Sequence, residues 1–391
     1  MAVKRWTAPV LAVALCLGLW GCARGFAVSQ KGLSRQPLTT YESIGTPAAA
    51  YYPDNRMARN ALDMEIHDGR LYVGCGDYDK NTGPTPVLSC DLKSLGQWQK
   101  EASLPDEQIG RFVTVGGRLT IPGMDPEGRP KTGTYYQLAK DGWQVRNGLP
   151  HNLHHFDMVQ YRGALFAALG AQPGGSSLAI SRDGGKTYKQ VRLMKKGKPV
   201  DTATYGLVRS YNLYQVDGGL YADLWWVQED TKTWSYEIYR YEKGNFVYIS
   251  DLRKSIKGGQ NGYTVPPLWT KETFKDTLFL SAGYLYTTKD MQTFAPVALR
   301  ENAVTYDLYR CGKRLYILTA TPRQEGEKTT YTVEIYSVAN PQKERYRVEA
   351  RFDYPVIPTA LAVDKEHFFI ATGDWHTENE KNGTILCMNR K

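Results

Sequence analysis

Short segments with alternating apolar and polar residues run along nearly the whole chain, and a tight polar turn joins many of them in pairs. One pair reads His67-Asp68-Gly69-Arg70-Leu71-Tyr72-Val73, with Asp-Gly between the two segments. Successive side chains of a strand point to opposite faces, and Asp-Gly favours a two-residue turn between antiparallel strands. The pattern therefore predicts a β-hairpin, and no segment keeps a helical period long enough to compete.

The same hairpin pattern occurs seven times, at intervals of 37 to 58 residues. The apolar residue that marks the second strand of each copy is, in order, Leu71, Leu119, Leu165, Leu220, Leu278, Leu315 and Phe368. A third strand and usually a fourth follow each hairpin, as in segments 178–181 and 188–191. Because one such unit cannot cover its own apolar faces, the units must stack in a ring. The sequence predicts an all-β fold, a seven-bladed β-propeller of four-stranded antiparallel blades, as one domain over residues 38–391.

The last repeat contains a third predicted strand, 383–388, but no fourth strand after it. The early stretch Thr39–Ile44 precedes the first repeat and is free to supply that strand. Such pairing would remove an exposed sheet edge. We therefore expect the ring to be closed by an N-terminal strand.

The N-terminus has the layout of a secretory signal, in which Lys4 and Arg5 precede an apolar run from Ala8 to Trp20. This run is too short to span a bilayer, which takes about 20 residues. It ends in Leu19-Trp20-Gly21-Cys22, which resembles the lipobox of bacterial lipoproteins, although Trp20 departs from the usual small or aliphatic residue. The resemblance implies a signal peptide over 1–21, a lipid on Cys22, and a linker over 22–37. It implies an exported protein held by that lipid at the outer membrane or cell surface, with a secreted or periplasmic protein as the alternative.

Charge and cysteine content narrow the function classes. The formal net charge is +9, but apart from Lys195-Lys196-Gly197-Lys198 the basic residues are scattered. A nucleic-acid-binding protein would gather them in a stripe with exposed aromatic residues, so we expect no nucleic-acid partner.

Beyond the N-terminal region the chain has four cysteines, Cys75, Cys90, Cys311 and Cys387. Four cysteines allow three possible sets of disulfide pairings. Cys75 and Cys90 lie at similar distances from the turn at Thr82-Gly83, so a hairpin could place them opposite each other.

One turn carries a recognisable motif. Segment 181–188 reads Ser-Arg-Asp-Gly-Gly-Lys-Thr-Tyr and resembles the Asp box, or BNR repeat; segment 288–294 resembles a shorter version, and 89–98 a degenerate one. The chain thus resembles the Asp-box β-propeller family, which includes sialidases, other glycoside hydrolases and non-enzymatic receptors. The resemblance implies structural roles for Asp183 and Asp290, which cap the turn between third and fourth strands. The motif indicates the fold and does not by itself indicate a reaction or a ligand.

A polar position recurs eight residues before the marker residue of each hairpin. Five of the seven repeats have a polar side chain there, and these are Asp63, Arg111, Asp157, Asn212 and Asp307. The next residue is apolar in all five, so the polar groups share one face of the innermost strands. We expect a polar ring around the central channel. Two interpretations stay open, a water-bridged ring that satisfies its own polar groups and a ligand or cation site at the channel mouth.

Loops after the second strands of the first and last repeats supply further candidates. Asp77, Asp79 and Asn81 offer oxygen ligands at alternate positions, as in an EF-hand calcium loop. Gly83 comes one place late, however, and Leu88 stands where the loop needs Glu, so a self-capping turn is the simpler interpretation.

In the last repeat, Asp374 and His376 lie in a similar loop, which ring closure would place beside the first one. His154 and His155 precede the third innermost strand and are expected on the same rim, although adjacent residues of a strand cannot both face one metal ion.

These patterns favour a non-catalytic binding or scaffold module of the cell envelope, without a cofactor, for a protein or a glycan. The alternative is a sialidase-like glycoside hydrolase that uses Asp63, Asp157, Asp307 and Arg111 at the channel mouth. Sialidases carry an Arg-Ile-Pro signature, which is absent here, and Arg111 is followed by Phe112. Glycoside hydrolysis would also require two carboxylates about 5–9.5 Å apart across a sugar.

Overall fold

The computed structural model describes residues 38–77, 80, 82–125, 133–149, 152–171, 177–202, 205–228, 233–252, 256, 270–374 and 377–390. The predicted signal peptide, Cys22 and the linker lie outside the described residues, as do Asp79, Asn81 and His376. No helix among the described residues is both long and apolar enough to cross a membrane.

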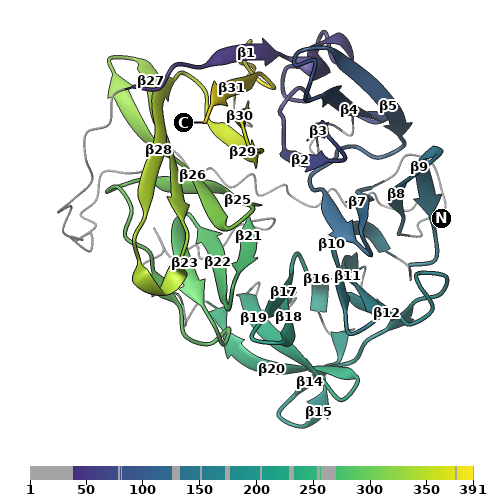
Figure 1. Ribbon diagram of the computed structural model, residues 1–391. Coiled ribbons are helices and arrows are strands. Elements are labelled where there is room, and N and C mark those ends of the chain that lie inside the picture. The colour runs from purple at the N-terminus through teal and green to yellow at the C-terminus, as the bar shows by residue number, and fades with distance from the viewer. Residues whose placement is uncertain are drawn as a thin grey trace.

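The chain folds into mainly antiparallel sheets that surround a common centre, and the fold is therefore a β-propeller (Figure 1). Five sheets in the described part of the chain contain four strands each. The first two are β2 (Asp63–His67), β3 (Arg70–Gly74), β4 (Thr85–Asp91), β5 (Trp98–Leu104) and β6 (Val113–Val115), β7 (Arg118–Pro122), β8 (Tyr135–Ala139), β9 (Gly142–Arg146). The next two are β21 (Lys271–Phe274), β22 (Thr277–Ala282), β23 (Tyr284–Thr288), β24 (Ala295–Pro296) and β25 (Val304–Cys311), β26 (Arg314–Glu325), β27 (Lys328–Val338), β28 (Arg347–Tyr354). The last is β29 (Pro358–Val363), β30 (His367–Thr372), β31 (Ile385–Asn389) and β1 (Glu42–Gly45).

One sheet is larger, with eleven strands. It contains β10 (Asn152–Tyr161), β11 (Ala164–Ala171), β12 (Leu178–Ser181), β13 (Lys189–Gln190), and β17 (Leu213–Val216), β18 (Gly219–Gln228), β19 (Thr233–Glu242), β20 (Asn245–Asp251). It also contains β14 (Leu193–Lys195), β15 (Lys198–Pro199) and β16 (Tyr205–Arg209). Strand β16 pairs with both β11 and β18 and so joins two four-stranded groups. The sequence did not predict this strand, and two of the units that it predicted as separate are therefore continuous.

The hairpins form where the turn residues predict them. Asp68 and Gly69 have φ of 46° and 76°, and Gly116 and Gly117 have φ of 60° and 75°. Two successive left-handed residues make the turn whose twist matches that of the flanking strands. This turn fixes the register of β2 against β3, in which Met64 lies opposite Val73.

The N-terminal strand closes the ring, as the sequence predicted. Strand β1 pairs with β31, and Glu42 lies opposite Cys387; Figure 1 shows the purple β1 beside the yellow β31. Ile44 is 8% exposed and packs into the apolar cluster between the first and last sheets. Its carbonyl oxygen accepts a hydrogen bond from Trp98 Nε1 at 2.7 Å. A short 3-10 helix, η1 (Pro47–Ala50), then leads toward β2.

Apolar side chains between neighbouring sheets form the core. Three of the four described cysteines are buried there, in the cluster between the first and last sheets. All four thiols are free. The expectation that a hairpin places Cys75 opposite Cys90 is wrong, because the register of β3 against β4 sets Cys90 opposite Leu71. Cys75 lies past the end of β3, where its thiol contacts the carbonyl oxygen of Pro86 at 3.9 Å.

The turn after β12 is held by Asp183. Its Oδ1 accepts hydrogen bonds from the amides of Lys186 and Thr187, at 3.1 and 3.0 Å, and Oδ2 accepts one from the Thr187 hydroxyl at 2.5 Å. These hydrogen bonds, chiefly those from Thr187, lower the pKa of Asp183. Tyr188 follows the turn, and its hydroxyl lies 3.2 Å from that of Tyr135 in β8 of the preceding sheet. Asp183 thus stabilises a turn, and the aromatic residue links two sheets.

Candidate functional site

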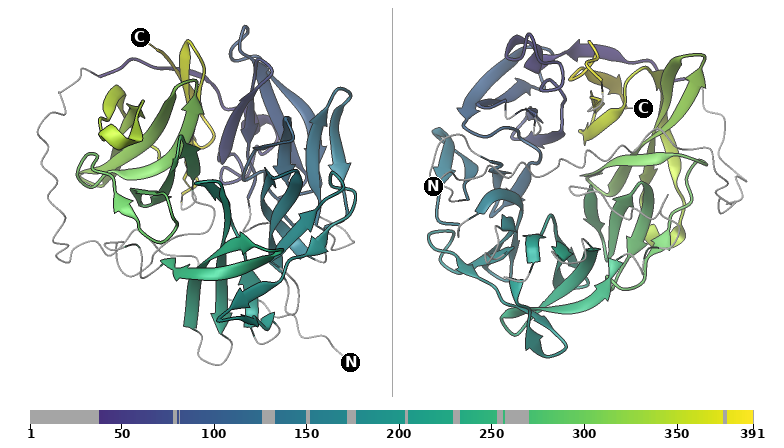
Figure 2. Two further views of the ribbon diagram at one scale, coloured as in Figure 1. Left: turned by 60° about the horizontal axis from the view of Figure 1, so that its bottom comes forward. Right: turned by 180° about the vertical axis from the view of Figure 1, so that it is seen from behind.

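The five polar residues predicted around the channel occupy equivalent places next to the centre. Asp63 begins β2, Asp157 lies within β10 and Asp307 within β25, while Arg111 and Asn212 stand just before β6 and β17. The first strands of the sheets border the central space in Figure 1, and the view from behind in Figure 2 shows the same arrangement. The complete ring stays a prediction; Arg111 directly contacts two other members, Asn212 and Asp157.

Each of the three aspartates links its strand to the next repeat of the ring. One carboxylate oxygen accepts a hydrogen bond from an amide of the following repeat: Phe112 N to Asp63 at 2.5 Å, Leu213 N to Asp157 at 2.8 Å, and Leu361 N to Asp307 at 2.7 Å. The other oxygen accepts from the next residue of the same chain segment: Met64 N at 2.9 Å, Met158 N at 3.0 Å and Leu308 N at 2.7 Å. The carboxylates thus act as clamps between neighbouring units of the ring.

Thr270 has the same role in the fifth repeat. Its hydroxyl accepts a hydrogen bond from Leu308 N at 3.1 Å and donates one to Asp307 Oδ1 at 2.8 Å. Thr270 stands eight residues before Leu278 but was not among the predicted ring residues.

Other contacts join the inner strands of neighbouring repeats and of repeats that are separated by one other repeat. Arg111 Nη2 donates to Asn212 Oδ1 at 3.0 Å, and Nη1 lies 3.4 Å from Asp157. Lys271, the first residue of β21, donates to the Asp157 carboxylate and to the carbonyl oxygen of Leu213.

On the other side of the ring, the Tyr309 hydroxyl donates to Glu65 Oε1 at 3.0 Å. The polar groups of the channel thus form hydrogen bonds and ion pairs with one another.

Burial and charge set the ionisation of these groups. Burial alone would raise the pKa of Asp157, which is 1% exposed, but Lys271 and Arg111 outweigh it and hold that pKa below its usual value. Burial lowers the pKa of Lys271. Burial, together with the charge of Asp307, raises the pKa of Asp63 well above its usual value. The ring is therefore asymmetric, with an ion-paired half around Asp157 and an acidic half around Asp63.

Two glutamates of the acidic half are close to half-protonated at neutral pH. Burial is the largest cause that raises the pKa of Glu65 to about 7, and Tyr309 partly opposes it. Burial likewise raises the pKa of Glu272 to about 7, partly opposed by Arg310.

Glu65 and Glu272 make stability depend on pH. In the unfolded chain both lose their protons near the ordinary glutamate pKa of about 4.3, whereas the folded protein holds them up to about pH 7. Their contribution is therefore fully present below about pH 4.3 and is lost as pH rises through about 7. We expect the free energy of unfolding, measured with urea, to fall by about 3 kcal/mol for each glutamate, roughly 6 kcal/mol for the two together, between pH 4.5 and 7.5. The double variant Glu65→Gln, Glu272→Gln should flatten this slope, and an unchanged slope would contradict the assignment.

The loops after the second strands and before the first strands gather at one rim. The Asp77 carboxylate accepts hydrogen bonds from Asn55 Nδ2 and from the Lys80 amide, both at 3.3 Å. Asp77 therefore caps its own loop, while the other two predicted calcium ligands lie outside the described residues.

The loops of the first and last repeats are neighbours, as expected from ring closure, because Lys80 Nζ lies 3.2 Å from Glu378 Oε1. The Asp374 amide donates to Asn60 Oδ1 at 3.0 Å, and Asp374 Oδ2 accepts a hydrogen bond from the Thr377 hydroxyl at 2.7 Å. The structure thus places Asp77 and Asp374 on the same rim, each within a hydrogen-bonded loop.

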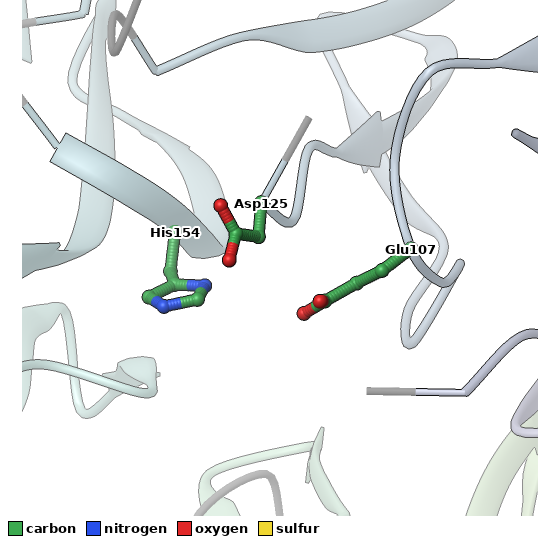
Figure 3. A group of neighbouring side chains, drawn as sticks. All are labelled: Glu107, Asp125 and His154. Carbon is green, nitrogen blue, oxygen red and sulfur yellow. The ribbon is translucent and has the colours of Figure 1, made fainter. Parts of the chain in front are cut away.

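The same rim brings together Glu107, Asp125 and His154 (Figure 3). One ligand atom from each of these side chains lies within 4.8 Å of the other two. Glu107 is 2% exposed and His154 6%, while Asp125 is partly exposed. Sequence reasoning singled out His154 but missed the two acids, because they lie in loops of different repeats with no characteristic spacing.

The two adjacent histidines have different surroundings. His155 is fully buried, and its Nε2 lies 3.1 Å from the carbonyl oxygen of Asp157. Burial lowers the pKa of His155 to about 4. Burial, assisted by the charge of Arg209, lowers the pKa of His154 to about 3. Both imidazoles are therefore neutral at pH 7, and only His154 faces the two acids.

A separate depression of about 270 Å³ lies at the opposite rim, between the turns of the third and fourth repeats. Arg162, Arg240 and Lys243 line it, with Tyr161 and Tyr241. It is set apart from the channel ring and from the loop rim because the turns between first and second strands point the other way.

No family model matches the chain, and no curated protein does. Among solved structures, Saccharomyces cerevisiae Sqt1 has 9% identity over 90% of this chain and 98% of that chain, with a TM-score of 0.45. The phage phi92 endosialidase has 10% identity over 91% of this chain and 71% of that chain, with a TM-score of 0.43. Drosophila Semaphorin 1a, extracellular domains 1-2, has 9% identity over 85% and 87%, with a TM-score of 0.47. At such low identities and TM-scores, these likenesses carry no argument about ligand, partner or activity.

Proposed function

We propose that this chain is a non-catalytic binding or scaffold protein of the cell envelope. It is exported, anchored through a lipid on Cys22, and it presents the loop rim that carries Asp77, Asp125 and Asp374 to an envelope protein or a glycan. The observation that carries this proposal is that the aspartates of the channel are already paired with other groups of the protein. Its aspartates are used to clamp neighbouring strands and to pair with Arg111 and Lys271, so they serve closure of the ring.

The propeller is proposed to have seven blades of the Asp-box type. The eleven-stranded sheet contains two groups of four consecutively paired strands, β10–β13 and β17–β20. Counted as the third and fourth blades, they match the third and fourth sequence repeats. The hydrogen bonds of Asp183 and the equivalent ones of Asp290, which accepts from the amides of Gln292 and Thr293 at 2.8 Å each, support the motif assignment.

The rim assignment is tested by cross-linking in the intact envelope. A photo-reactive residue at Glu380, whose side chain is 81% exposed on the loop rim, should cross-link a partner protein. The same group at Lys243, which is exposed at the opposite rim, is the matched control and should not. If the ligand is a glycan, a glycan array probed with the mature protein should show binding that Glu378→Lys and Glu380→Lys together reduce at least tenfold.

Cross-links from Lys243 alone, or no product at either place together with a blank glycan array, would overturn the rim assignment.

The lipid anchor is tested separately. Metabolic labelling with a fatty acid should mark the wild-type chain but not Cys22→Ser, and the variant should leave the membrane fraction. Membrane retention of the unlabelled variant would contradict the anchor.

A glycoside hydrolase is the second candidate, favoured by the raised pKa values of Glu65 and Glu272. A carboxyl group that is still protonated near neutral pH is suited to act as a general acid. Turnover of aryl glycosides or sialosides by the mature protein, abolished in Glu65→Gln with the fold intact, would replace the first proposal.

A further inference from the structure

The three side chains in Figure 3 come from three chain segments that the backbone holds together. Glu107 lies between β5 and β6, Asp125 follows β7, and His154 is in β10. The amide of Glu107 donates to the carbonyl oxygen of Met124 at 3.3 Å, and an isolated β-bridge joins Met124 to His154. The convergence of the three side chains therefore results from backbone pairing between two repeats.

The residues that flank these three are held in place by hydrogen bonds as well. Asp106 is 1% exposed, accepts a hydrogen bond from Met124 N at 2.5 Å, and accepts another from the Tyr136 hydroxyl. The His155 amide donates to the carbonyl oxygen of Gly123 at 2.9 Å. These hydrogen bonds hold the backbone segments from which the three side chains project.

Asp125 has a left-handed backbone, with φ of 48°. Such a conformation is uncommon outside glycine, although Asp tolerates it better than most residues. It occurs here at the end of a strand rather than within a two-residue hairpin turn, and it accompanies the convergence of the carboxylate with His154 in Figure 3. Unusual backbone conformations of this kind cluster at ligand-binding sites.

The donor set indicates which ion would fit. One imidazole nitrogen and two carboxylate oxygens suit Zn²⁺ or Mn²⁺, whereas Ca²⁺ and Mg²⁺ are bound by oxygen ligands alone. Bonds of about 2.0–2.2 Å place the ligands of a tetrahedral ion roughly 3.4 Å apart. The observed limit of 4.8 Å therefore requires shifts of about 1 Å, within reach of side-chain rotation.

The surroundings leave one side of the group open. Glu107 and His154 are buried, while Asp125 is partly exposed, so an ion would be shielded from one side only. The positive charge of Arg209 acts on His154 and disfavours a metal ion, but the two carboxylates carry the larger charge. Its guanidinium lies 5.9 Å from the centre of the Phe156 ring, and it donates to the Tyr211 hydroxyl at 3.3 Å.

We propose that Glu107, Asp125 and His154 bind one divalent transition-metal ion, Zn²⁺ or Mn²⁺, at the loop rim. Three protein ligands leave at least one coordination position for water or for an oxygen atom of a bound molecule. Phe156, Tyr211 and Met124 form an apolar wall beside the group. The proposal does not depend on the function proposed above, because a metal site would serve a scaffold and a hydrolase alike.

The test is metal binding to the mature chain carrying Cys22→Ser, after removal of metals with EDTA. In isothermal titration, ZnCl₂ or MnCl₂ should bind with a stoichiometry of one and a Kd in the micromolar range or below, and CaCl₂ and MgCl₂ should bind at least tenfold more weakly. Glu107→Gln, Asp125→Asn and His154→Gln should each weaken Zn²⁺ binding by about 10–100-fold. Asp141→Asn, an exposed acid in the β8–β9 turn of the same sheet, and His67→Gln are the matched controls and should leave it unchanged.

A second measurement on the unsubstituted protein guards against variants that fail to fold. Co²⁺ should give visible d–d absorption bands that Zn²⁺ displaces stoichiometrically, and Zn²⁺ should raise the Tm. Binding that the three substitutions leave intact, an absence of Co²⁺ bands and of a Tm shift, or equal affinity for Ca²⁺ would each overturn the proposal.

Discussion

Replacing Asp157 by alanine should lower the free energy of unfolding by about 3–5 kcal/mol. The side chain is 1% exposed, carries a charge and is paired with both Lys271 and Arg111. Its removal leaves two cations near the channel without their counter-charge and the Leu213 amide without its acceptor. Breaking a buried pair from one side costs far more than the pair itself contributes. Urea unfolding followed by tryptophan fluorescence measures the loss.

Two further variants separate this explanation from a general effect of an added cavity. Lys271→Met in the Asp157→Ala background should recover part of the loss, because it removes one of the unpaired buried cations. Asp141→Ala, at an exposed turn, should change stability by no more than about 0.5 kcal/mol. The account fails if Asp157→Ala stays within about 1 kcal/mol of the wild type, or if Lys271→Met adds to the loss.

Removal of β1 should be the second large effect. A mature chain that starts at residue 46 instead of residue 38 lacks the strand that pairs with β31 and the buried side chain of Ile44. Burial of an isoleucine contributes about 1.5–3 kcal/mol and each lost hydrogen bond about 0.5–1.5 kcal/mol, so the expected loss is roughly 4–6 kcal/mol. Thermal unfolding of the two chains, matched in every other respect, gives the comparison.

The shorter chain should also associate. Without β1, strand β31 presents unpaired amides and carbonyls along a sheet edge, which is a template for pairing with another molecule. Size-exclusion chromatography with light scattering should show dimers or larger species for the chain that starts at residue 46, and monomers for the one that starts at residue 38 if the native chain is monomeric. Equal stability and equal size of the two chains would refute closure by this strand.

Much of the fold is readable from local chemistry. The turn pairs Asp68-Gly69 and Gly116-Gly117 adopt the left-handed backbone that their sequence favours, because that preference depends on two residues and not on distant parts of the chain. The same holds for the turn at Asp183, whose partners lie within four residues of it. The missing fourth strand of the last repeat indicated closure, and the structure shows it.

Other features could not be read in this way. Strand β16 occupies a long connection, and it forms because β11 and β18 extend far enough to offer it two edges. The pairing of Asp157 with Lys271 joins residues that are far apart in the sequence, and their repeats have unequal loop lengths. The cysteine register also differed from expectation, because Leu71 and not Cys75 lies opposite Cys90.

The sequence by itself determined the repeated hairpin unit, the place of the hairpin turns and five polar positions on the innermost strands, since all three depend on strand periodicity and turn preference. The tertiary structure alone decided what the channel residues contact and which rim loops converge. Those contacts, Asp157 with Lys271 and Glu107 and Asp125 with His154, arise where different repeats meet. Their geometry depends on the stacking of whole sheets, which no local pattern encodes.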